Sequence, residues 1–242
     1  MKRLVQYIAD KLGFVVVGKW GVSSYLLESR IKRIIAEYDI DCIFDVGANV
    51  GQYHDFLRKK VGFKGTIVSF EPDPNNCEEL REKKLHDKKW VIQEFALGRE
   101  DTVLQLNIMS NSAFNSFLEP NNIETSLFQN ANTVENVVSV KVKRLSDIFF
   151  ELKEKYNFNN VFLKLDTQGF DLDVFDGASE CLDQIKGVQT EVSVLPIYKN
   201  MPSIETSLEL FKSKGFEVSG LYSLSETRFP HAIEFDCIYL PK

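Results

Sequence analysis

A glycine-rich turn between two short apolar stretches constrains the fold of this 242-residue chain more than any other feature. Residues 42–46 form a predicted strand that runs into the turn Gly-Ala-Asn-Val-Gly at 47–51. A helical pattern follows, and a second predicted strand at 66–70 ends in Glu71. Such a turn lets a ligand approach the backbone and directs helix N–H groups at it, while an acid after the next strand suits two neighbouring ribose hydroxyls. The pattern predicts a site for an adenosine-containing cofactor.

The rest of the chain alternates between predicted helices and predicted strands. Helices are expected at 24–38, 74–86, 146–156, 170–182 and 204–214, with Ser146 as an N-cap and a break near Gly177. Further strands are expected at 90–95, 103–109, 137–142, 161–165, 188–194, 216–222 and 233–240. This alternation predicts an α/β fold whose mostly parallel sheet is covered on both faces. The last two strands have no long helix between them, which favours one antiparallel strand.

Two regions flank or interrupt this pattern. Residues 1–39 are expected to form an N-terminal helical extension packed on a single domain at 40–242. Residues 110–136 are rich in Asn and Ser and show no clear periodicity. A connection of that length is usually a functional loop or lid, or a mobile segment, and both interpretations stay open.

Composition limits the expected partners. The net charge is −6 and the isoelectric point is about 5.3, so we expect no nucleic acid as a partner. No apolar run approaches the roughly 20 residues of a membrane span, so no stable membrane insertion is expected. The first 20 residues show apolar side chains at helical spacing, and Asp10 and Lys11 interrupt them, which favours an amphipathic helix over a signal peptide. The four cysteines lack CxxC spacing and suit a reducing, cytoplasmic location.

Five stretches of the chain, taken together, resemble the FkbM family of S-adenosylmethionine-dependent methyltransferases. They are FDVGANVGQY (44–53), SFEPDPNN (69–76), FALG (95–98), LKLDTQGFDLDVFDGA (163–178) and TEVSVLPIY (190–198). The resemblance implies a seven-stranded, doubly wound Rossmann-like sheet of the class I methyltransferase type with an antiparallel last strand. It also implies O-methylation of a hydroxyl on a glycan, a sugar-containing precursor or a natural product. Gln168 and Asp171 depart from the pattern, because many relatives carry glutamate there.

The resemblance places S-adenosylmethionine on the first two motifs. We expect Asp45 to order the turn and, through water, to hold the ammonium group of the cofactor. Gly47 and Gly51 would let the methionine part approach the backbone, and Asn49 would bond its own turn. Glu71 would accept hydrogen bonds from both ribose hydroxyls. The remaining expected cofactor residues are Tyr53, Pro72 and Ala96, the last of them near adenine.

Methyl transfer to an alcohol needs an aligned nucleophile and a group that removes its proton. In an open α/β sheet the site lies beyond the carboxyl ends of the strands, where Asp166 and Glu191 are expected. These two acids are candidates for the base or for acceptor orientation, and His231 is a third candidate if its loop folds over the site. A divalent cation bound by Asp166, Asp171 and Glu191 is the less favoured interpretation, because acidic strand ends are common without metal.

Two other functions fit parts of the pattern. A nicotinamide-dependent oxidoreductase also has a strand, a glycine turn and an acidic strand end, but the turn here reads GANVG instead of GxGxxG. A non-catalytic cofactor-binding protein of the same fold is the second alternative, left open by Gln168 and the undetermined base. Neither the methyl acceptor nor the oligomeric state follows from these residues.

Overall fold

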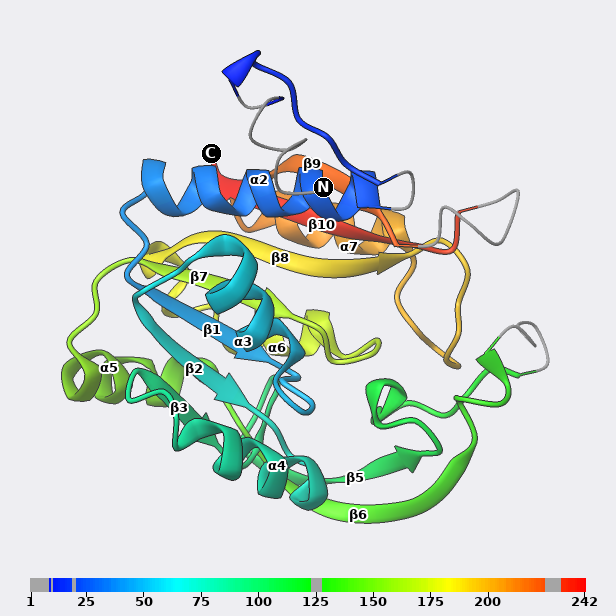
Figure 1. Cartoon of the computed structure of the whole chain (residues 1–242). Coiled ribbons are helices and arrows are strands. Elements are labelled where there is room, and N and C mark those ends of the chain that lie inside the picture. The colour runs from blue at the N-terminus through cyan, green and yellow to red at the C-terminus, as the bar shows by residue number, and fades with distance from the viewer. Residues whose placement is uncertain (1–8, 10, 19–20, 123–127, 225–231) are drawn as a thin grey trace.

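The computed structural model describes residues 9, 11–18, 21–122, 128–224 and 232–242 (Figure 1). Its centre is a seven-stranded sheet in the order β3-β2-β1-β7-β8-β10-β9. The bounds are β1 (Cys42–Val46), β2 (Thr66–Phe70), β3 (Trp90–Gln93), β7 (Val161–Leu165), β8 (Ile185–Ser193), β9 (Phe216–Ser223) and β10 (Glu234–Pro241). β10 pairs antiparallel with both neighbours, and the other pairs are parallel. The expected seven-stranded, mostly parallel sheet is confirmed.

Helices cover both faces of this sheet. One face carries α2 (Val22–Glu37), α3 (Gln52–Phe56) with the π-helical turn η2 (Leu57–Val61), and α4 (Pro74–Lys84). The other carries α5 (Leu145–Tyr156), α6 (Asp171–Gly177) and α7 (Ile204–Ser213). Successive strand residues point to opposite faces. Ile43 therefore packs in the cluster of Ile31 and Leu57, while Phe44 packs in the cluster of Phe149 and Phe175.

A second, three-stranded sheet stands beside the carboxyl edge of the first. It consists of β4 (Ala96–Leu97), β5 (Thr102–Met109) and β6 (Val134–Lys143) in the order β4-β6-β5. The strand expected at 90–95 was too long, because the chain leaves β3 after Gln93 and starts β4 at Ala96 in the other sheet. β5 and β6 form an antiparallel hairpin, and the 3₁₀ turn η3 (Ser112–Phe114) lies in the segment that joins them. Residues 110–122 of this segment fold back towards the main sheet (Figure 1).

Ser146 does not cap α5, so that prediction was wrong. The helix begins at Leu145, and Arg144 stands at the N-cap position without a side-chain capping bond. Ser146 lies inside the first turn and donates its hydroxyl to the carbonyl of Gly177 at 2.8 Å. The serine thus ties α5 to the end of α6, a contact that local sequence does not reveal.

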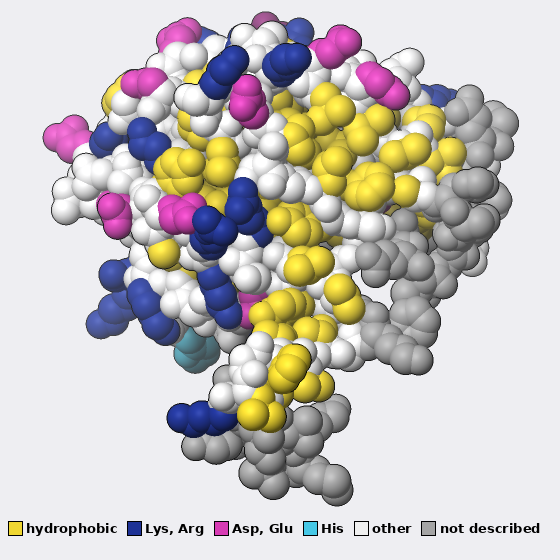
Figure 2. Space-filling view, turned by 90° about the horizontal axis from the view of Figure 1, so that it is seen from above, with side chains coloured by type: hydrophobic (Ala, Val, Ile, Leu, Met, Phe, Trp, Pro, Cys, Tyr) yellow, Lys and Arg dark blue, Asp and Glu magenta, His cyan; other side chains and the backbone are white. Residues whose placement is uncertain are grey.

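The N-terminal segment leaves apolar side chains on the surface. α2 is the expected N-terminal helical segment, and its buried residues Ile31 and Ile34 pack in the core. Figure 2 shows an apolar area that runs from the projecting N-terminal residues over α2 and β9. Leu12, Phe14 and Leu26 are exposed apolar side chains of the N-terminal segment and α2. Within the described residues, no helix has the length and apolarity needed to cross a membrane.

The glycine turn depends on left-handed backbone at three positions. Gly47, Asn49 and Gly51 have φ values of +77°, +48° and +87°. A Cβ atom on Gly47 would lie 1.9 Å from the carbonyl oxygen of Asp166, and one on Gly51 would lie 2.8 Å from the ring of Trp90. The turn therefore brings the ends of β1 and β7 closer together than any side chain would allow.

We expect Gly47→Ala to destabilise the protein more than Gly62→Ala. Gly62 is a matched control, because its φ is +79° but a Cβ atom there would meet nothing within 4 Å. Both variants incur the left-handed cost of roughly 1–2 kcal/mol, and Gly47→Ala adds a main-chain clash of about 2 kcal/mol or more. Urea unfolding measures the difference, and equal losses in the two variants would contradict the close approach.

Candidate functional site

A cavity of about 430 Å³ lies at the carboxyl edge of the main sheet. The ends of β1, β2, β7 and β8 form its floor, the second sheet and η3 form one wall, and α2 and α3 contribute the other. Eight of the expected site residues line it: Gly47, Asn49, Tyr53, Glu71, Pro72, Ala96, Asp166 and Glu191. Asp45 is completely buried in β1, and Gly51 faces Trp90 and Leu80. His231 lies outside the described residues.

Main-chain N–H groups fix the carboxylate of Glu71 at the tip of β2. Asn49 donates its N–H to Oε2 at 2.7 Å, and Asp73 donates its N–H to Oε1 at 2.9 Å. The residue is only 4% exposed, and this burial raises its pKa to about 7 despite the two donors. A buried carboxylate that faces a cavity gains from further hydrogen-bond donors, which the two hydroxyls of a ribose would supply.

The segment after β5 closes over the glycine turn. Ser112 donates its hydroxyl to Oδ1 of Asn49 at 3.0 Å, and the amide of Asn115 donates to Oδ2 of Asp73 at 2.8 Å. Asp73 is also the N-cap of α4, where it accepts the N–H of Asn75. The start of the Asn-rich segment therefore contacts both motifs of the expected cofactor site, and its role as a lid stays a prediction.

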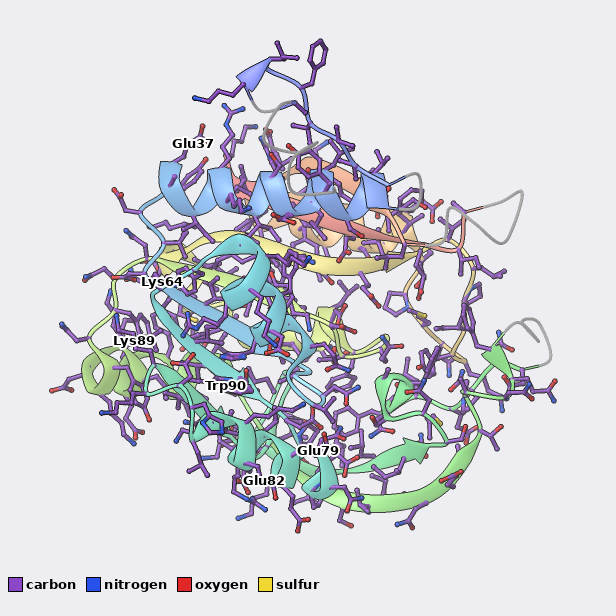
Figure 3. The ribbon with its side chains drawn as sticks, in the orientation of Figure 1. Glu37, Lys64, Glu79, Glu82, Lys89 and Trp90 are labelled. Carbon is purple, nitrogen blue, oxygen red and sulfur yellow. The ribbon has the colours of Figure 1, made fainter. Side chains whose placement is uncertain are left out.

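A buried lysine, Lys164, pairs with a carboxylate below the cavity floor and with one that lines the cavity. Nζ of Lys164 lies 3.1 Å from Oδ1 of Asp45 and 3.2 Å from Oδ2 of Asp166. Ser69 donates its hydroxyl to Oδ2 of Asp45 at 3.1 Å, and Trp90, at the start of β3 in Figure 3, donates its indole N–H to Ser69 at 2.9 Å. The sequence interpretation missed Lys164, although a lysine inside the apolar strand VFLKL was a visible signal.

Gln168 joins the two expected catalytic acids. It adopts a left-handed φ of +52°, and its amide nitrogen lies 2.9 Å from Oδ1 of Asp166 and 3.2 Å from Oε2 of Glu191. Burial, together with the carboxylates of Asp166 and its neighbours, raises the pKa of Glu191 well above its ordinary value. The structure thus brings Asp166 and Glu191 together, with Glu191 favouring its neutral form.

Asp171 does not face the cavity as a free ligand. Its Oδ1 accepts the N–H of Thr167 at 2.7 Å and the hydroxyl of the same threonine, and its Oδ2 accepts the hydroxyl of Thr190 at 2.7 Å. It therefore fixes the start of α6 against β8. Among the described residues, no group of three or more His, Cys, Asp or Glu side chains is placed to hold a metal ion.

Several residues that line the cavity lie outside the sequence motifs. Tyr53 donates its hydroxyl to Gln189 at 2.8 Å, and Gln189 donates its amide to Asp236 on β10 at 2.7 Å. Ser24 and Leu27 reach the cavity from α2. Burial raises the pKa of Asp236 to about 6. No local pattern marks Ser24, Leu27, Gln189 or Asp236, because only the packing of α2 and the order of the strands bring them to one place.

The sheet order and the position of the cavity define an α/β protein with the class I methyltransferase topology. A family model described as the methyltransferase FkbM domain matches residues 45–218, and the chain belongs to that family. The match covers the glycine turn, Glu71, Asp166 and Glu191. α2 and β10 lie outside it, although both contribute residues to the cavity.

Solved structures of methyltransferases resemble the chain at low identity. Methyltransferase FkbM from Methylobacillus flagellatus KT is 16% identical with a TM-score of 0.49, over 84% of this chain and 44% of that one. The chain thus spans less than half the length of that protein. Magnesium protoporphyrin IX methyltransferase from Synechocystis PCC 6803, with bound S-adenosylmethionine, is 9% identical with a TM-score of 0.49, over 91% and 81%. An rRNA methylase from Streptococcus thermophilus is 9% identical with a TM-score of 0.44, over 88% and 94%. No curated protein matches the sequence.

We expect the stability of the unliganded protein to fall as Glu71 loses its proton. The pKa of Glu71 is about 7 in the folded protein against an ordinary value of 4.5. Between these values the folded state binds more protons, so the stabilising contribution is complete below pH 4.5 and is lost as the pH rises through 7. Between pH 5 and pH 8, the ionisation of Glu71 alone should lower the free energy of unfolding by about 2–3 kcal/mol.

Urea unfolding of Glu71→Gln at both pH values tests this expectation. The variant should show a smaller loss of stability than the wild type, while Glu79→Gln, on the exposed side of α4 (Figure 3), should behave as the wild type does. An unchanged pH dependence in Glu71→Gln would show that the carboxyl group of Glu71 titrates normally in the folded protein.

Proposed function

We propose that this protein is an S-adenosylmethionine-dependent O-methyltransferase that acts on a hydroxyl group. Membership of the FkbM domain family supports the methyltransferase class. The single observation that carries the cofactor and the reaction is that two groups of residues line the same cavity. The glycine turn and Glu71 line it together with the acid pair Asp166 and Glu191, so an adenosine site and a proton acceptor share one space.

The described residues fit this cofactor. Glu71 presents a fixed carboxylate to a ribose diol, and the turn at 47–51 exposes its backbone to the methionine part. Acidic side chains around the cavity suit the positive charges of the cofactor's ammonium and sulfonium groups. When bound, S-adenosylmethionine supplies a methyl group activated by a positively charged sulfur. The cavity volume of about 430 Å³ is within the range of small-molecule and cofactor sites.

Asp166 is the proposed base. Its side chain is 33% exposed and lines the cavity, so an acceptor hydroxyl can reach it and release its proton to a carboxylate oxygen. Burial raises the pKa of Glu191 and favours its neutral form, which can donate a hydrogen bond that orients the acceptor oxygen. The second sheet and the segment after β5 cover the cavity and limit the access of water.

A sugar-containing small molecule or a glycan is the proposed acceptor class. Gln189 and Asp236 add an amide and a carboxylate to the same cavity, and such groups bind neighbouring hydroxyls well. The net charge of −6 disfavours a nucleic acid acceptor. A nicotinamide cofactor is the competing interpretation of the glycine turn, and binding measurements separate the two.

We expect S-adenosylhomocysteine to bind with micromolar affinity in calorimetry, and NAD and NADP not to bind. Glu71→Gln should weaken that binding about 10- to 100-fold, since hydrogen bonds to a charged group contribute about 1.5–3 kcal/mol. Glu79→Gln serves as the control and should bind like the wild type. Preference for a nicotinamide, or no binding of either class, would overturn the proposed function.

Asp166→Asn should separate binding from turnover. We expect its affinity for S-adenosylhomocysteine to stay within about threefold of the wild type, because the ribose and adenine contacts remain. Its kcat with a sugar acceptor found by screening should fall about 10²- to 10⁴-fold through the loss of the base. Full activity in this variant would remove Asp166 from the base role and leave Glu191 as the candidate.

A further inference from the structure

Lys164 brings a positive charge into the acidic part of the cavity. The residue is 6% exposed and reaches two carboxylates from near the carboxyl end of β7. Its ammonium group also lies 5.1 Å from the centre of the Tyr53 ring, which shields it from solvent. A charge this deeply buried is tolerated only where opposite charges and hydrogen bonds compensate it.

The two carboxylates that Lys164 contacts are in different situations. Asp45 is completely buried and is also held by the hydroxyl of Ser69, so it cannot move away from the lysine. Asp166 has one third of its side chain exposed and lines the cavity. Asp45 therefore holds the ammonium group of Lys164 in place, and this group attracts the carboxylate of Asp166.

Among the residues that the structure describes, no lysine or arginine is paired with the neighbouring acid Glu191 in this way. Gln168 contacts both Asp166 and Glu191, but the ammonium group of Lys164 is paired with Asp166 and Asp45. Within the described part of the chain, the other titratable groups around the pair come from several elements: Glu71, Asp171, Tyr198, Glu234 and Asp236. They are acidic or neutral, and they favour the uncharged form of any carboxyl group near them.

We propose that Lys164 is a positioning residue: its ammonium group, 3.2 Å from Oδ2 of Asp166, keeps that carboxyl group charged and turned into the cavity, where Asp166 acts as the base. The role as base rests on the proposed function, whereas the charge state of Asp166 does not. Burial lowers the pKa of Lys164, but Asp166 and Asp45 outweigh this effect and raise it above its ordinary value, so the lysine stays charged. Burial and the surrounding carboxylates raise the pKa of Glu191.

Carboxyl ¹³C NMR of the full chain labelled at aspartate tests the proposal without an acceptor. The resonance of Asp166 is assigned by its loss in Asp166→Asn and followed from pH 4 to pH 9. In Lys164→Met its titration should move to higher pH by about one unit or more, and Lys164→Arg should restore most of the wild-type curve. An unmoved titration in Lys164→Met would overturn the proposal.

A second variant keeps the test valid if Lys164→Met does not fold. Lys164→Met leaves Asp45 buried without a cation, so the double variant Lys164→Met/Asp45→Asn removes both buried charges together. If Lys164 only joins β1 to β7, Asp166 should titrate in this double variant as in the wild type, and the proposal fails. Failure of the wild type to bind S-adenosylhomocysteine would instead overturn the proposed function and leave the titration result valid.

Discussion

The ion-paired group of Asp45, Lys164 and Asp166 holds together both the sheet and the site. Asp45 and Lys164 are paired positions on the adjacent strands β1 and β7, and Asp166 follows where β7 ends. Burying such charges is costly, and the cost is offset only when they remain in contact. The same contact requires β1 and β7 to end at the same level, with Gly47 pressed against the carbonyl of Asp166. The geometry of the cavity floor follows from this arrangement.

The rest of the cavity is built by elements that this central pair of strands positions. β2 carries Glu71 beside the glycine turn, and β8 and β10 carry Glu191 and Asp236 on the opposite side. The second sheet then closes the space through Ser112 and Asn115. The end of the cavity at Glu71 and the end at Asp166 and Glu191 are therefore separate regions of one strand edge, as the proposed reaction between a cofactor and a second substrate requires.

Sequence reasoning succeeded where one continuous segment carries the signal and failed where distant segments meet. The strand, the turn and Glu71 are contiguous, so their arrangement at one edge of a parallel sheet was predictable. The bonds of Asp171 to Thr167 and Thr190 were not predicted, because they depend on how α6 meets β8. The partners of β4, β5 and β6 could not be derived from their apolar patterns. The pairing of Lys164 with Asp45 likewise depends on the register between β1 and β7, which the sequence alone does not give.

A crystal structure of the complex with S-adenosylhomocysteine tests the central claim most directly. The account predicts that the ribose hydroxyls contact the carboxylate of Glu71 and that the sulfur atom faces the side of the cavity where Asp166 and Glu191 lie. A ligand whose ribose lies away from Glu71, or whose sulfur points away from this acid pair, would contradict the assignment of one cavity to both cofactor and base.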